Sequence, residues 1–196
     1  MTDPLLDPGD EAATPLTPQE RHALIPSYIT LRRELNEAEQ IGITDADRWA
    51  FSRKRDVLDP QVLRRLHRQM FKAVWRWAGE HRTTPRNIGV EAWHIETDLR
   101  QLLDEVGYWI AHNTYPPDEI AVRFHHRLVL IHPFPNGNGR HTRLAADLLA
   151  VRLGRPRMTW GSGSLTAIAE LRRRYIGALK AADANDIKPL LAFARS

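Results

Sequence analysis

The sequence predicts a compact all-α domain that carries one small β-hairpin flap. Apolar residues recur at helical spacing through most of the chain, and these stretches are bounded by capping residues, proline or glycine. Only residues 82–93 lose the helical period, and they contain the Thr, Pro, Asn and Gly residues that favour a hairpin. With 196 residues and 42% hydrophobic content, the chain is long enough to bury one core.

The N-terminal part of the chain is expected to form a tail and a small helical segment. Residues 1–18 are rich in Pro, Asp and Thr, so we expect a flexible tail. A helical pattern follows over residues 19–40 and is interrupted at Pro26. Residues 19–58 therefore form a helical segment that precedes the main unit.

The main unit spans residues 59–196. Asp59 caps a helix that has Pro60 at its first position, and we expect this helix to end at Gly79, before the flap. Five further helices are expected after the flap, and their signals are the apolar face from Leu99 to Ile110, Pro117 with Pro133 beyond the end, Arg140 to Gly154, the Ser164 cap, and the Asp186 cap.

The composition excludes several classes of protein. The chain has no cysteine, so it forms no disulfide and no thiolate metal site. It has neither the apolar segment of a signal peptide nor an apolar run of membrane-spanning length, and we expect a cytoplasmic protein. The formal net charge is +4, but no basic stripe with interleaved aromatic residues is present. Direct binding to nucleic acid is therefore not expected.

The segment with the clearest chemistry spans residues 132–143 and reads HPFPNGNGRHTR. Gly137 and Gly139 allow the backbone to approach a ligand closely, and the loop leads into the positive N-terminal end of a helix. Arg140 and Arg143 are three residues apart, so they share a face and could clamp two neighbouring phosphates. His132 stands before the loop and can accept a proton near neutral pH.

Other interpretations of this segment fit less well. The glycines are not followed by Lys-Ser/Thr, as they are in a Walker loop, and a helix rather than a strand precedes them, unlike in a dinucleotide fingerprint. His125, His126, His132 and His141 could suggest a zinc hydrolase, but no acidic or thiolate partner is near them in the sequence.

The segment resembles the signature of the Fic family, which is His-Pro-Phe-x-Asp/Glu-Gly-Asn-Gly-Arg-x-x-Arg, and all fixed positions but one match. Upstream, the sequences WAGEHR and TPRNIG over residues 77–89 resemble the stretch in which the family forms its substrate-docking flap. In length and layout, the chain is also similar to the proteins known as mobile mystery protein B.

The resemblance implies transfer of AMP from ATP to a Ser, Thr or Tyr hydroxyl of a target protein. It implies that His132 is the general base, and that Gly137, Asn138 and Gly139 hold the α- and β-phosphates. Arg140 would neutralise the leaving pyrophosphate, and Arg143 would place the γ-phosphate. The flap would pair edge-on with the target peptide as an added strand, through Thr84, Pro85, Arg86, Asn87, Ile88, Gly89 and Val90. A DNA-binding partner encoded by an adjacent gene, as in toxin–antitoxin-like pairs, is a further implied partner.

One position departs from the signature. The family's acidic ligand of Mg²⁺ is Asn136 here, and an amide oxygen offers the ion a dipole but no charge. Doc-like kinases tolerate Asn at this position, which keeps phosphate transfer as an alternative, and a catalytically silent regulatory protein is another. Those kinases often carry Lys where this chain has Gly139, so AMP transfer is favoured.

The family is often restrained by a helix that bears Ser/Thr-x-x-x-Glu-Gly/Asn. Thr30 to Glu34 match the first half of this pattern within a possible inhibitory helix over residues 27–40, whereas Leu35 stands where Gly or Asn is usual. The resemblance implies that Thr30 and Glu34 are inhibitory, with a direct contact between Glu34 and Arg143.

Overall fold

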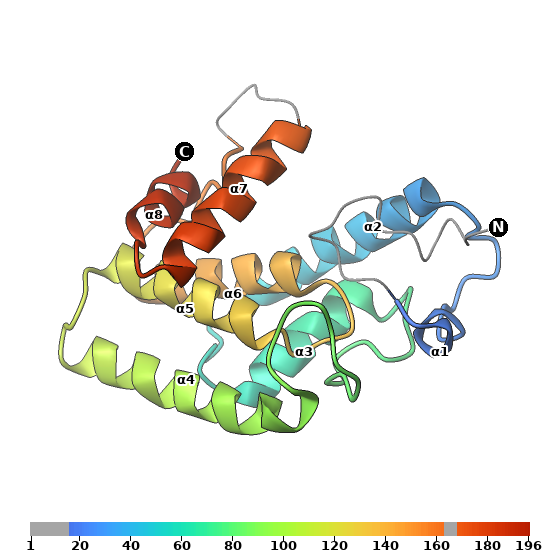
Figure 1. The fold of residues 1–196 in the computed structure, drawn as a ribbon, viewed down its shortest axis with the longest axis horizontal. Helices are drawn as coiled ribbons and strands as arrows, with labels where there is room; N and C mark the ends of the chain where they lie inside the picture. Colours follow the sequence, from blue (N-terminus) through green and yellow to red (C-terminus); the bar gives the residue numbers. More distant parts are fainter. Residues whose placement is uncertain (1–15, 163–167) are drawn as a thin grey trace.

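The computed structural model describes residues 16–162 and 168–196, and within them it contains eight α-helices and one short 3₁₀ helix (Figure 1). The elements are α1 (Pro18–Arg21), α2 (Arg32–Phe51), α3 (Pro60–Phe71), η1 (Ala92–His94), α4 (Ile95–Ala111), α5 (Pro117–Ile131), α6 (Asn138–Arg152), α7 (Ile168–Asp183) and α8 (Lys188–Ala194). The prediction of an all-α fold is thus confirmed for the described residues. None of these helices combines the length and apolarity needed to cross a membrane.

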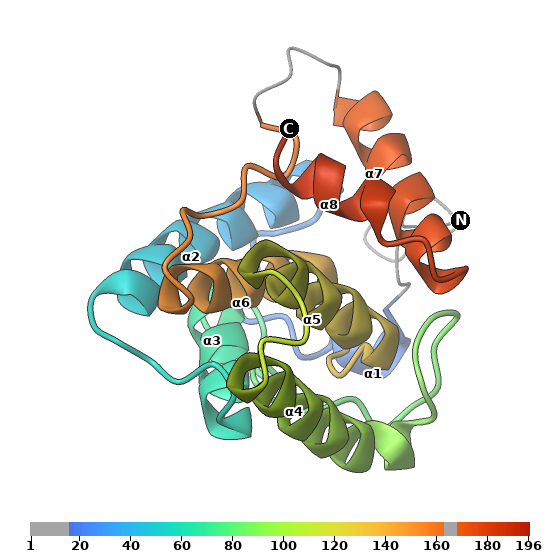
Figure 2. The same cartoon turned by 90° about the vertical axis from the view of Figure 1, so that its left-hand side faces the viewer.

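The helices α5 and α6 form the central pair of the domain, joined by the loop 132–137. The helix α4 packs against α5, while α2 and α3 pack together and contact α6 (Figure 2). The α7–α8 pair lies on top in the view of Figure 1, where α8 contacts α5. Side chains from these helices meet in one core, and the largest fully buried ones are those of Trp75, Phe71, Phe124, Phe134, Leu35, Leu63, Leu66, Met70, Ile95, Leu99 and Leu102.

The predicted caps of α3 and α5 are found in the structure. The Asp59 carboxylate accepts a hydrogen bond from the Gln61 amide at 2.8 Å, and Pro60 occupies the first helical position. The helix α5 begins with Pro117 and ends at Ile131, and its C-cap His132 directly precedes Pro133. The Ser164 cap lies outside the described residues. Near α8, the Asp186 carboxylate accepts from the Lys188 amide at 3.2 Å.

The prediction that the helix beginning at Pro60 continues to Gly79 was wrong, because α3 ends at Phe71. Residues beyond it turn to pair with the segment before α2: Leu24 and Trp75 form an antiparallel bridge, and the Ile25 amide donates to the Val74 carbonyl at 2.9 Å. The apolar residues at helical spacing are still buried, but long-range backbone pairing replaces the last helical turns.

The β-hairpin predicted near residues 82–93 is also absent, since no strand occurs among the described residues and residues 82–91 form an irregular loop before η1. The carbonyls of Thr84 and Val90 both accept hydrogen bonds from the guanidinium of Arg82. A hairpin needs such carbonyls to face the opposite strand, so binding to one internal cation replaces the ladder. The helix expected over residues 27–40 is displaced as well, to the range of α2.

Candidate active site

The loop between α5 and α6 turns sharply at two left-handed residues. His132 has φ 53° and ψ 58°, and Gly137 has φ 78°. A Cβ atom at position 137 would lie 2.5 Å from the ring of Phe71, so the turn requires glycine both for its backbone angle and for space. The turn fixes where α6 begins, so the unpaired amides and the partial positive charge of this helix end lie next to the loop.

Side chains beneath the loop fix its shape. The Asn138 amide group accepts from the Phe134 N–H at 3.0 Å and donates to the Phe134 carbonyl at 2.7 Å. The Gly79 N–H donates to Nδ1 of the buried His67, so Nε2–H of His67 donates to the Asn136 carbonyl at 3.0 Å. The rings of His67 and Phe134 stack with their centroids 3.8 Å apart. The Asn138 side chain therefore holds the loop, and only its backbone is left to meet a phosphate.

His132 is positioned as a neutral base. Its side chain is buried at 7% exposure, and its Nδ1 lies 3.3 Å from the Val129 carbonyl. A carbonyl only accepts, so Nδ1 carries the hydrogen and the lone pair is on Nε2. Burial lowers the pKa of His132 to about 4; the Val129 carbonyl opposes this shift, and the positive charges of Arg82 and Arg86 add to it. At neutral pH the imidazole can therefore accept a proton.

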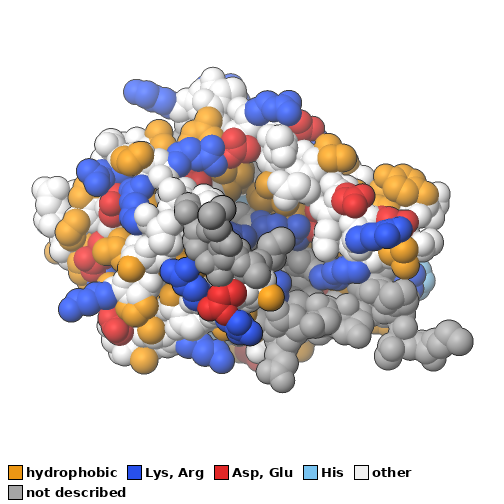
Figure 3. Space-filling view, turned by 90° about the horizontal axis from the view of Figure 1, so that it is seen from above, with side chains coloured by type: hydrophobic (Ala, Val, Ile, Leu, Met, Phe, Trp, Pro, Cys, Tyr) orange, Lys and Arg blue, Asp and Glu red, His pale blue; other side chains and the backbone are white. Residues whose placement is uncertain are grey.

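The two arginines of the motif, which lie at the start of α6, have different neighbours. An ion pair joins Arg140 to Glu39 of α2 with 2.7 Å between Nη2 and Oε2, and the same guanidinium lies 5.1 Å from the centre of the Phe71 ring. The guanidinium of Arg143 lies 5.4 Å from the centre of the Tyr175 ring. Figure 3 views the molecule from above and shows a hollow with Lys or Arg side chains around it and in its floor.

Comparison with known proteins shows which family the segment around this loop resembles. Residues 57–150, which include the whole motif, match the model of the Fic/DOC family. The chain contains a Fic/DOC family domain. Protein adenylyltransferase fic-1 of Caenorhabditis elegans is 30% identical over 173 residues, which are 82% of this chain and 32% of the worm protein. The chain thus spans about a third of the length of this curated relative.

Solved structures agree on the Fic fold. Fic-1 from C. elegans has a TM-score of 0.67 at 26% identity, covering 90% of this chain and 52% of that one. The N-terminal Fic domain of a VirB-translocated Bep effector protein from Bartonella quintana, solved with bound ADP, has a TM-score of 0.69 at 18% identity. That match covers 90% of this chain and 94% of the effector domain.

Glu39 is the acidic residue that reaches the Fic motif, and sequence reasoning missed it. Its side chain is only 4% exposed, and Oε1 accepts a hydrogen bond from the Trp75 indole at 2.7 Å while Oε2 pairs with Arg140. The signal that could have found it is a carboxylate four residues after the buried Leu35, on the apolar face of α2.

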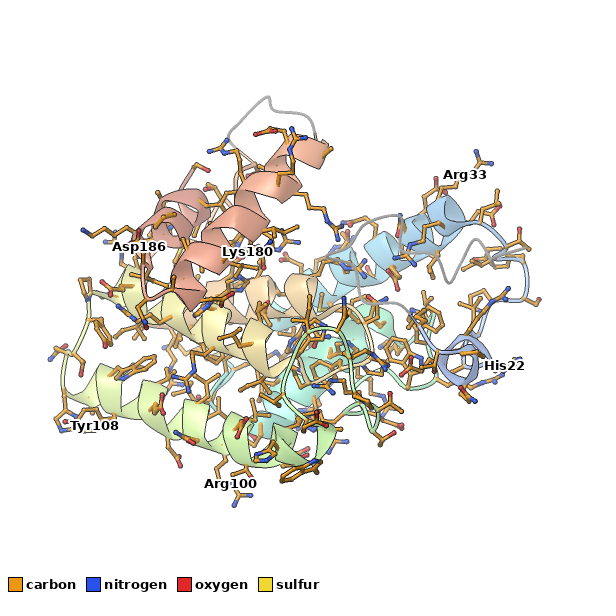
Figure 4. All side chains as sticks on the ribbon, in the orientation of Figure 1. His22, Arg33, Arg100, Tyr108, Lys180 and Asp186 are labelled. Carbon is orange, nitrogen blue, oxygen red and sulfur yellow. The ribbon has the colours of Figure 1, made fainter. Side chains whose placement is uncertain are left out.

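Glu34 lies at the start of the same helix and has another role. Its carboxylate accepts from the amides of Thr30 and Leu31 at 2.9 and 3.0 Å, and these hydrogen bonds lower the pKa of Glu34. Figure 4 shows the neighbouring Arg33 at the outer end of α2, pointing away from the domain. The expected contact between Glu34 and Arg143 is therefore absent from this structure, because Glu34 caps its own helix.

Asn136, the residue that was expected to bind Mg²⁺, already accepts hydrogen bonds from within the protein. Its side-chain oxygen accepts from the Gly137 amide at 2.5 Å. Across the described ranges, no three His, Asp or Glu side chains are grouped in a way that could hold a metal ion. The residues present fit Mg²⁺ only as an ion held mainly by nucleotide phosphates and water, with one amide oxygen from the protein.

The expected docking flap lies against the base as a loop. Thr84, Pro85, Asn87 and Gly89 are exposed, whereas Arg86 is anchored by Glu20 of α1. A Cβ atom at position 89 would lie 2.6 Å from the Cβ of His132, so the loop and the base are in close contact.

Proposed function

We propose that this Fic/DOC domain transfers AMP from ATP to a Ser, Thr or Tyr hydroxyl of a target protein. The observation that carries the proposal is a buried His132, neutral at physiological pH, at the lip of a loop that opens into a helix N-terminus bearing Arg140 and Arg143. The name of the worm relative, a protein adenylyltransferase, supports AMP transfer, and the ADP bound to the Bartonella effector domain supports a nucleotide at this corner.

The residues would act by positioning and by charge. Nε2 of His132 takes the proton of the target hydroxyl as its oxygen attacks the α-phosphorus; the new P–O bond forms, the bond to the β-phosphate oxygen breaks, and pyrophosphate leaves. The backbone of Gly137, Asn138 and Gly139 binds phosphate oxygens, while Arg140 and Arg143 balance the charge on the pyrophosphate. Mg²⁺ held beside Asn136 would supply further positive charge to the phosphates.

The target would dock on the loop that contains residues 84–90. Loops of this kind can still add an extended peptide by backbone pairing when the peptide offers the second strand, so the absence of a hairpin in the free protein does not oppose docking. Thr84, Pro85, Asn87 and Gly89 are exposed, and Gly89 lies beside His132.

A Doc-like kinase is the second candidate, and Asn136 is compatible with it. In that reaction the γ-phosphate of ATP, not the α-phosphate, would meet the hydroxyl. A silent regulatory protein would transfer neither group.

Labelled ATP separates these functions. The protein is incubated with a cell lysate and with ATP labelled at either the α- or the γ-phosphate; label from the α-position alone is expected. Label from only the γ-position would establish the kinase, and no label from either position would favour a regulatory protein. His132→Ala is expected to reduce transfer by about 10²-fold or more while ATP still binds. Unchanged transfer in that variant would remove His132 from the reaction.

We propose further that α2 restrains the active site. Thr30 and Glu34 were the residues expected to do so, but the buried Glu39–Arg140 ion pair supports Glu39 as the residue that occupies a phosphate-binding arginine. Likeness to mobile mystery protein B and a DNA-binding partner protein remain predictions that follow from the same resemblance, and a cytoplasmic location remains a prediction from the composition of the sequence.

A further inference from the structure

Arg82 is a buried cation whose hydrogen bonds all go to backbone carbonyls around the base. The residue is 3% exposed. Its Nε donates to the His132 carbonyl at 2.7 Å, Nη1 donates to Thr84 at 2.9 Å, and Nη2 donates to Val90. A longer contact of 3.4 Å reaches the Ile131 carbonyl. One guanidinium therefore binds both ends of residues 84–90, here called the docking loop, and also the backbone of His132.

No carboxylate of the described residues binds this guanidinium, which is unusual for a buried charge. The end of α5 compensates in part, since the Ile131 and His132 carbonyls belong to the negative C-terminal end of that helix. Burial lowers the pKa of Arg82, and nearby Glu91 opposes the shift through its charge alone. A neutral residue would anchor a surface loop with a smaller desolvation penalty than a buried charge. The advantage of arginine at this site is therefore the fixed, planar arrangement of its N–H donors.

We propose that Arg82 is a positioning residue that fixes the docking loop at a set distance from His132. The proposal rests on the proposed function, because it explains how a hydroxyl on a docked target comes within reach of Nε2. The Arg82 amide also donates to the Pro133 carbonyl at 2.9 Å, so backbone and side chain bind the same corner. Gly89 completes the contact: a Cβ there would lie 2.7 Å from Nη2 of Arg82.

This arrangement predicts that loss of the fork affects the chemical step more than nucleotide binding. The phosphate-binding groups are on α6, whereas Arg82 contacts the loop and the end of α5. A misplacement of about 1 Å between reacting groups can cost roughly 10²-fold in rate. Arg82→Lys keeps the positive charge but cannot bind three carbonyls in the fixed geometry of a guanidinium.

The test combines two variants and a matched control. Arg82→Lys and Gly89→Ala should each lower kcat for transfer to a target by about tenfold or more, with the Kd for ATP unchanged. Gly89→Ala keeps the Arg82 residue but pushes the loop away from both His132 and the Arg82 guanidinium, so it keeps the test valid if Arg82→Lys does not fold. Arg195→Lys is the control, because Arg195 donates to the Pro156 and Arg157 carbonyls and binds Asp118 at the opposite end of α5. It should leave kcat unchanged.

Hydrogen exchange supplies a readout that requires neither nucleotide nor target. Amides of residues 84–90 and 131–133 should exchange faster in both test variants than in the wild type and the control. Unchanged exchange and unchanged kcat in both variants would overturn the coupling, whichever group is transferred. Faster exchange in a protein whose wild type transfers no label would refute the proposed function and keep the anchoring of the loop by Arg82.

Discussion

His132 shows how a single residue depends on its surroundings for its chemistry. A non-glycine residue in the left-handed region costs roughly 1–3 kcal/mol and persists only where neighbours hold it. Here its amide donates to the Leu128 carbonyl at 3.2 Å, and its own carbonyl accepts from Arg82. The strain places the imidazole against the loop, where burial keeps it neutral. The neutral form of the His132 imidazole is thus a consequence of the fold around it.

Asn136 leads to a prediction at the residue scale. Asn136→Asp adds a carboxylate next to the phosphates and just before the N-terminus of α6, where a negative charge is favourable. We expect the Mg²⁺ concentration for half-maximal transfer to fall by about tenfold, because charge strengthens ligation by an oxygen donor. The measurement is a titration of transfer with Mg²⁺ at saturating ATP, with the melting temperature as a check on folding. An unchanged or higher Mg²⁺ requirement would show that position 136 does not neighbour the metal.

The sequence identified the residues of the motif but not the residues that hold them. Gly137, Asn138 and Arg140 are adjacent in the chain, so their pattern is visible without a structure. The partners Glu39, His67 and Arg82 are distant in sequence, and each looks like an ordinary residue of a helix or loop. Which distant carbonyl or guanidinium a side chain meets depends on how helices pack, and a local pattern carries no information on that.

At the scale of elements, α2 brings a carboxylate onto the active site. This helix packs on α3 and contacts α6, which buries Leu35 and Glu39 on one face. Its N-terminal turn is instead closed by Glu34, in a capping arrangement with Thr30 and Leu31. Two glutamates five residues apart, about one and a half turns, therefore have different roles, one as a cap and one as a contact to the motif.

Glu39→Gln and Glu34→Gln form a matched pair for testing the restraint. A hydrogen bond to a charged group is worth about 1.5–3 kcal/mol, so release of Arg140 in Glu39→Gln should raise AMP transfer by about ten- to a hundredfold. Glu34→Gln weakens only the cap, so we expect a lower melting temperature and unchanged transfer. Both are measured with α-labelled ATP, including self-modification. Activation by Glu34→Gln alone would restore the original assignment of Thr30 and Glu34, and activation by neither would leave α2 as a packing element.

The flap is the element whose form the sequence did not predict. Turn residues and the loss of helical period correctly indicated a non-helical segment over residues 82–91 of the predicted range, but they do not distinguish a hairpin from a loop closed by an internal cation. Arg82 reads as one more basic residue until the end of α5 is placed beside it. For the same reason, the end of α3 was placed too late: Val74 and Trp77 keep helical spacing but are buried by pairing and turns.

At the scale of the whole molecule, the fold buries neutral histidines within the motif and around it. His67, His125, His132 and His141 are buried, and burial is the largest cause that lowers the pKa of each one, to about 3 for His125 and about 4 for His132 and His141. Their hydrogen bonds and stacking connect α3, α5 and the loop. Burial of these histidines therefore helps to hold the loop at neutral pH, but it carries a cost in the stability of the domain at acidic pH.

The cost predicts how stability depends on pH. Between about pH 6.5 and pH 4, these histidines are protonated in the unfolded chain but not in the native one, so the unfolded state binds more protons and stability falls as the pH falls. Each contributes a slope of up to about 1.4 kcal/mol per pH unit in this window. Carboxylates with lowered pKa values, such as Asp118, add to the loss only at lower pH.

Urea unfolding at pH 8.0, 6.5, 5.8 and 5.2 (roughly spanning the window in which the unfolded histidines gain protons) measures this slope. We expect little change in the free energy of unfolding from pH 8 to 7 and a steep fall below pH 6.5. In His141→Gln one of the histidines with a lowered pKa is gone, so the slope should be smaller than in the wild type, even if the variant is less stable overall. A flat profile down to pH 5.2, or the same slope in both proteins, would mean that the buried histidines titrate normally and that the loop is open to water.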